Sequence, residues 1–175
     1  GETIYFVFIW IFIFLAYGTT PYVSSLQATK QISKLNYFIS FGRKSSLLIG
    51  ILSAGLLIFV SSQLINFFEP TPNVSSKAIS YLILRSLGLP FYLLNMHSTA
   101  VLRGMKYPKI TLYSSVIVGV SNVVLSYFLG IVLNFGITGI AVSSSIAFFI
   151  SSLYSTKVLI DTQTQTTNSV ISEEK

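Results

Sequence analysis

The sequence predicts an all-α, polytopic membrane helix bundle with about five transmembrane helices. Hydrophobic residues make up 52% of the 175 residues and charged residues only 9%, and the mean hydropathy is +0.74. A soluble domain carries about 25% charged residues, so this chain has too few charges to cover a surface in water. Its apolar runs are also long enough to cross a hydrocarbon core of roughly 30 Å, which takes about 20 residues.

The apolar runs divide the chain into a helical bundle over residues 1–160 and a short tail. Gly18 and Pro21 in the first run are expected to bend its helix, and the third run contains Pro90. The tail over residues 161–175 is rich in Thr and Gln, and we expect it to be disordered and cytoplasmic. The expected helices cover residues 4–27, 45–67, 76–102, 110–133 and 137–160.

The charges of the connections predict the orientation of the bundle. The first and third connections are basic and hold no acid, whereas the second holds only Glu69 before Lys77 and the fourth has no charge. Positively charged loops stay in the cytoplasm. The first helix should therefore enter from outside, and the fifth should end inside. The cations of the two basic connections are Lys30, Lys34, Arg43 and Lys44 in the first and Arg103, Lys106 and Lys109 in the third.

Composition and motifs argue against several classes of function. The net charge of +6 comes from cations clustered between apolar runs, which indicates topology determinants rather than nucleic-acid binding. The chain has no cysteine and therefore no thiolate site. None of its five acids lies inside an expected span, and no metalloprotease, hydrolase or nucleotide-binding motif is present. We expect no enzyme activity, no metal and no cofactor.

Polar and small residues recur at helical spacing in three of the expected helices. Side chains three or four positions apart share one helix face, so each set could line a cleft between helices. Hydroxyl and small residues are also common at packed membrane-helix interfaces, and for the hydroxyls we favour that interpretation. For Asn95 and Asn122, which place whole amides at membrane depth, both interpretations stay open. The sets are Tyr17, Thr20, Ser24 and Gln27, then Arg85, Gly88, Tyr92, Asn95 and Thr99, then Ser115, Gly119, Asn122 and Ser126.

Two ionisable residues of the third helix have alternative interpretations. Arg85 lies about seven residues into the apolar run, and we favour a side chain that reaches back to the outer interface over a ligand-binding cation. His97 is the one histidine of the sequence. It could carry protons, but we favour a tolerated residue near the cytoplasmic interface.

Three segments together resemble the multidrug and toxic compound extrusion (MATE) family, and most of all its DinF-like branch. The first resembles the family's fourth helix, the second resembles an Asn-x-x-Leu-Asp stretch in helix five, and the third resembles the Gly-rich opening of helix six. The likeness covers about residues 4–160. The segments read Tyr81-Leu-Ile-Leu-Arg-Ser-Leu-Gly-Leu-Pro90, Ser121-Asn-Val-Val-Leu-Ser126 and Gly136-Ile-Thr-Gly-Ile-Ala-Val-Ser-Ser144.

The resemblance implies that the chain forms helices two to six of a twelve-helix antiporter built from two lobes. Such antiporters export organic cations, drugs or metabolites in exchange for protons or sodium. By motif, Asn122 matches the helix-five Asn and Ser144 matches a helix-six Thr, whereas Ser126 stands where the family commonly has an Asp. Helix one is expected to be missing from this chain, so neither coupling acid is visible. The expected cavity residues are Asn122, Ser126, Ser144, Asn95, Tyr92 and Thr99.

Two other functions remain as alternatives. A flippase for lipid-linked oligosaccharides or peptidoglycan precursors would share the lobe architecture, although Arg85 as the single deep cation disfavours it. A non-transporting, truncated membrane protein is the other alternative. The expected partners are a small organic substrate, the lipid bilayer, and a second lobe or a second copy of the chain, with no nucleic acid.

Overall fold

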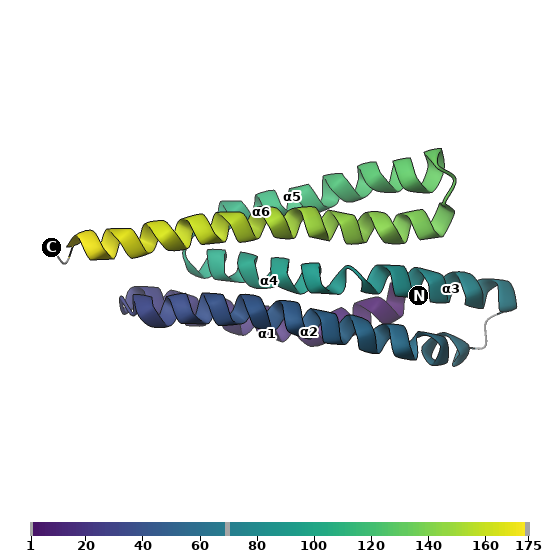
Figure 1. The fold of residues 1–175 in the computed structure, drawn as a ribbon, viewed down its shortest axis with the longest axis horizontal. Coiled ribbons are helices and arrows are strands. Elements are labelled where there is room, and N and C mark those ends of the chain that lie inside the picture. The colour runs from purple at the N-terminus through teal and green to yellow at the C-terminus, as the bar shows by residue number, and fades with distance from the viewer. Residues whose placement is uncertain (1, 69–70, 174–175) are drawn as a thin grey trace.

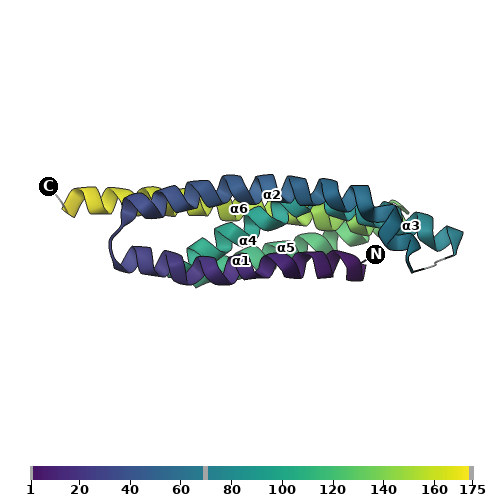
Figure 2. The same cartoon turned by 90° about the horizontal axis from the view of Figure 1, so that it is seen from below.

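A computed structural model describes residues 2–68 and 71–173, which form an elongated bundle of helices along one long axis (Figures 1 and 2). No strand occurs among these residues, which confirms the predicted all-α class. Four helices are long and apolar enough to cross a membrane, and a bent pair raises the number to five. The elements are α1 (Glu2–Ala28), α2 (Ile32–Asn66), α3 (Pro72–Ser86), α4 (Leu89–Gly104), α5 (Pro108–Leu125), the π-helix η1 (Ser126–Val132) and α6 (Gly136–Glu173).

Helix α2 begins well before the predicted start at residue 45. Its 35 residues measure about 52 Å at the rise of an α-helix, which exceeds the roughly 30 Å of a hydrocarbon core. The predicted boundary was wrong because hydropathy marks where a helix enters the apolar layer. It does not mark where the helix begins, and the basic segment around Lys34 and Arg43 is helical too.

The third predicted span is two helices rather than one. Helices α3 and α4 meet at Leu87 and Gly88 with a bend of 43°. Pro90 lies in the first turn of α4, where a missing N–H removes no intrahelical hydrogen bond. The proline therefore starts a new helix and does not merely kink a continuous one.

Helix α6 continues through residues 161–173, where the sequence predicted a disordered tail. Polar contacts with α2 fix part of this extension. Gln163 Nε2 donates to Asn36 Oδ1 at 3.0 Å, and Asn36 Nδ2 donates to Thr167 Oγ1 at 3.1 Å. The prediction failed because low hydropathy also describes a helix that pairs with another helix beyond the apolar layer.

Two apolar clusters hold α1, α2 and the α3–α4 pair together. One lies toward the α1–α2 connection and includes Val23, Leu35 and Leu102. The other lies toward the opposite end and includes Tyr5, Leu57 and Leu82. Helices α5 and α6 run side by side along the other side of α4 (Figure 1).

The connections alternate between the two ends of the bundle. In Figure 1 the α1–α2 and α4–α5 connections lie at the end where α6 terminates, and the α2–α3 and α5–α6 connections lie at the other. We therefore expect Lys34→Cys and Lys106→Cys to react with an impermeant maleimide from one face of a membrane. Asn73→Cys and Phe135→Cys should react from the opposite face. The sequence has no native cysteine, so each label reports one position, and labelling of all four from one face would contradict this topology.

Candidate functional site: a cavity between α3, α5 and α6

One face of α3 forms a wall of a cavity of about 510 Å³. Lys77, Tyr81 and Arg85 lie on this wall at intervals of four residues, which is the spacing that places side chains on one helix face. Asn122 of α5 and Ser144 of α6 lie among the residues that close the cavity. The two positions matched to the family by motif therefore meet at one cavity.

Hydrogen bonds join Asn122 to α6. Its Oδ1 accepts from Ser126 Oγ at 3.0 Å and from Ser144 Oγ at 3.2 Å, and Ser126 Oγ lies 3.0 Å from Ser143 Oγ. We call Asn122, Ser126, Ser143 and Ser144 the Asn122 cluster. A second hollow of about 540 Å³ is lined by Asn122 and Ser126, so Asn122 borders both hollows.

The side chain of Arg85 is buried, and the predicted position at the outer interface is wrong. Only 7% of the residue is exposed. Its Cζ lies 4.7 Å from the ring centroid of Tyr5 and 5.6 Å from that of Phe148, which are cation–π distances. Its Nε and Nη1 have no hydrogen-bond partner among the described residues. Hydropathy alone predicts that the side chain reaches outward to the interface. In the structure, attraction to the two aromatic rings holds the guanidinium inside the bundle.

Three predicted cavity residues, Tyr92, Asn95 and Thr99, do not line this cavity. The Tyr92 ring packs edge-on against Phe148 at 5.0 Å. Thr99 Oγ1 donates back to the Asn95 carbonyl at 2.8 Å. The structure thus places these side chains at helix contacts, a difference from the predicted placement.

The Asn95 side chain is the centre of a second polar cluster. Its Oδ1 accepts from Ser155 at 2.8 Å, from Ser114 at 2.9 Å and from Ser151 at 3.3 Å. The sequence reasoning missed all three serines and also Ser143. A signal was present for two of them, because Ser151 and Ser155 lie seven and eleven residues after Ser144, on the same helix face.

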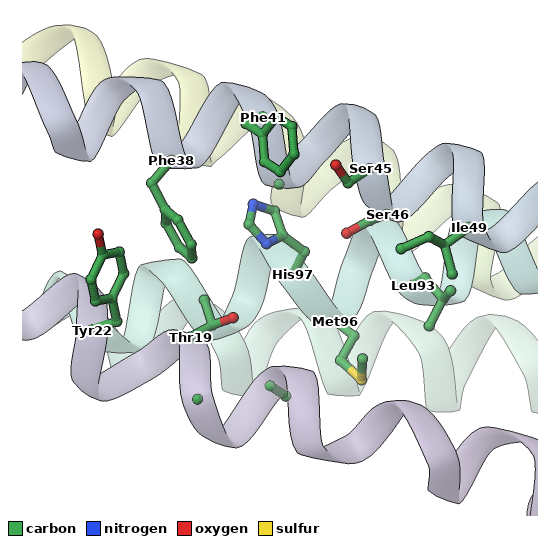
Figure 3. A pocket seen from close by; sticks show the side chains of 13 residues that line it. Thr19, Tyr22, Phe38, Phe41, Ser45, Ser46, Ile49, Leu93, Met96 and His97 are labelled. Carbon is green, nitrogen blue, oxygen red and sulfur yellow. The ribbon is translucent and has the colours of Figure 1, made fainter.

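A further cavity of about 550 Å³ lies between α1, α2 and α4 (Figure 3). Its lining is mostly apolar and aromatic, with Phe38, Phe41 and Met96 around it. His97 also lines it, buried, with Nε2 3.4 Å from the Ile39 carbonyl oxygen. The ring packs so closely on α2 that a Cβ on Gly42 would collide with it. None of the six predicted site residues lines this cavity between α1, α2 and α4.

The all-helical architecture and the polar cluster between α5 and α6 agree with the family resemblance, and a family model decides the family. The MatE model matches residues 1–128. The chain belongs to the MatE family. Members of this family are integral membrane transporters and not enzymes. Membership therefore confirms the predicted location in a membrane and the prediction that the chain is not an enzyme. The DinF-like branch stays a prediction.

Similar proteins come from two groups of transporters. The chain is 35% identical over 109 residues to Protein DETOXIFICATION 43 of Arabidopsis thaliana, covering 61% of this chain and 21% of that protein. It is 32% identical over 151 residues to Lipid II flippase MurJ of Thermosipho africanus, covering 82% of this chain and 31% of that protein. A solved MurJ structure in an inward closed conformation matches with a TM-score of 0.69 at 28% identity, over 91% of this chain and 37% of that one. The chain therefore spans less than half of each relative.

Proposed function

We propose that this chain is part of a MATE-type transporter that moves a small organic solute across a membrane by alternating access. The observation that carries the proposal is the Asn122 cluster at the cavity between α3, α5 and α6. Transporters place their substrate between helices near the middle of the membrane. An amide linked to hydroxyls across two helices offers polar contacts there. Exchange with a proton or sodium, and a second lobe or second copy that completes the pathway, are part of this proposal.

Removing the Asn122 amide should impair transport. In the complete transporter in vesicles, Asn122→Ala is expected to lower the efflux rate of a transported solute about tenfold, since each lost hydrogen bond of the half-buried amide costs about 0.5–1.5 kcal/mol. Val124→Ala is the matched control, because Val124 is an exposed residue on the same helix and lines neither cavity. Equal efflux rates for the two variants would show that the Asn122 amide does not take part in transport.

A lipid-linked precursor flippase is a second candidate, and the likeness to MurJ over 91% of the chain favours it. A single deep cation, Arg85, disfavours a flippase for a diphosphate. Lys77 lines the same cavity as Arg85, however, and so adds a second cation there. Translocation of a fluorescent undecaprenyl diphosphate between vesicle leaflets, compared with efflux of a water-soluble dye, separates the two candidates.

A further inference from the structure

The cavity between α3, α5 and α6 holds a buried cation without a described counter-ion. Arg85 is 7% exposed, and its Nε and Nη1 lack hydrogen-bond partners. A buried charge is strongly unfavourable unless it is paired and hydrogen-bonded. The faces of Tyr5 and Phe148 attract the charge, but ring faces accept none of the five N–H groups of a guanidinium in the way that an oxygen does.

The polar residues that line the cavity with Arg85 carry an ammonium, hydroxyls and an amide rather than carboxylates. Lys77 lies two turns away on the same face of α3, and Ser144 supplies a hydroxyl from α6. Among the residues that line the cavity in the described part of the chain, none is an acid. Glu2 and Glu69, the acids nearest in sequence to these helices, have side chains outside that part. Two cations on one wall repel a cationic solute and attract an anionic one.

We infer that this cavity binds the anionic group, a carboxylate or a phosphate, of the solute that is transported. Arg85 donates hydrogen bonds to its oxygens, and Lys77 contributes a second positive charge nearer the end of the bundle. A guanidinium suits this role because its fixed fork of donors matches the planar geometry of carboxylate and phosphate oxygens. The inference rests on the proposed transport function. It reverses the charge of substrate that the family resemblance alone implies.

Binding can be measured on the whole chain in nanodiscs of neutral phosphatidylcholine. A ligand of the folded state raises the unfolding midpoint with its concentration. We expect a rise with inorganic pyrophosphate or with succinate, and none with tetraethylammonium. Arg85→Met should weaken the apparent affinity at least tenfold. Arg103→Met is the matched control, because Arg103 is exposed and ends α4 at the far end of the bundle.

A second variant, Lys77→Gln, tests anion binding without a change in the stability of the fold. Lys77 is exposed, so Lys77→Gln should leave the midpoint without ligand unchanged and weaken anion binding several-fold. Arg85→Met without ligand should be at least as stable as the parent chain, since it removes an unpaired buried charge. Anion shifts that are absent in the parent chain, or equal in the parent and both variants, would overturn the inference.

Changing the lipid composition of the nanodisc distinguishes a lipid phosphate from a free anionic solute as the ligand of this cavity. If a lipid phosphate fills the site, replacing part of the phosphatidylcholine with phosphatidic acid should stabilise the parent chain but not Arg85→Met, and should weaken the response to succinate. If a free solute fills it, both chains should respond alike to the lipid. Failure of the transport proposal looks different. Anions would then bind to the nanodisc protein while the complete transporter moves no solute.

Discussion

Gly50→Ala is expected to destabilise the bundle by about 1–3 kcal/mol, the cost of overpacking a filled contact. A Cβ at Gly50 would collide with Pro90 Cα and would lie 2.9 Å from Pro90 N. Both are backbone atoms at the start of α4, which cannot rotate away as a side chain can. The steric cost therefore exceeds the gain of about 1 kcal/mol from replacing glycine by alanine within a helix.

Gly55 on the same helix provides the matched control. A Cβ added there meets no atom within 4 Å, so Gly55→Ala should leave stability unchanged or raise it by up to about 1 kcal/mol. Thermal unfolding of the two variants in the same nanodiscs is the measurement. Midpoints that shift by the same amount and in the same direction would show that α2 and α4 do not approach as closely as the structure has them.

The course of the chain through the bundle could be predicted from its sequence because it depends on two simple quantities. The length of each apolar run gives the spans, and the basic connections around Lys34 and Lys106 group the ends that lie together in Figure 1. Neither quantity carries information on helix continuity. The break at Leu87 and Gly88 and the π-helix that begins at Ser126 depend on backbone hydrogen bonding, which apolar composition does not specify.

The candidate site could be predicted only in part. Asn122, Ser126 and Ser144 were chosen by motif, and they lie together in one hydrogen-bonded cluster. Asn95 was predicted from the polar spacing on the third apolar run and from its depth, but it lies at a contact between α4, α5 and α6. An amide looks the same in sequence whether a serine of a neighbouring helix or a cavity faces it. The difference arises from how the helices cross, which a single sequence does not give.

The burial of Arg85 could not be predicted from the sequence either. From its depth in the apolar run, the expected outcome was a side chain reaching the interface. The aromatic partners that hold it inside lie 80 residues earlier, at Tyr5, and 63 residues later, at Phe148. No local sequence pattern around position 85 indicates these two partners. The burial of Arg85 in the cavity could therefore be found only from the folded structure.

Ser126→Asp is expected to give the complete transporter a new or stronger dependence on a proton or sodium gradient. Ser126 Oγ lies 3.0 Å from Asn122 Oδ1 and 3.0 Å from Ser143 Oγ, and it lines the second hollow beside the cluster. A serine hydroxyl does not exchange a proton near neutral pH, and it is a weaker ligand for sodium than a carboxylate. The aspartate would supply both properties at the position where the family pattern has an acid.

The size of the effect follows from the gradient. One proton exchanged per transport cycle contributes about 1.4 kcal/mol for each pH unit, which corresponds to a tenfold change in the ratio of solute concentrations across the membrane. The parent transporter and Ser126→Asp are compared in vesicles with imposed pH or sodium gradients. Ser126→Asn is the control, since the asparagine side chain is similar in size to that of aspartate but has no acidic proton to exchange. Identical gradient dependence in the parent and Ser126→Asp would exclude position 126 from coupling. Strong coupling in all three would place the coupling acid elsewhere in the complete transporter.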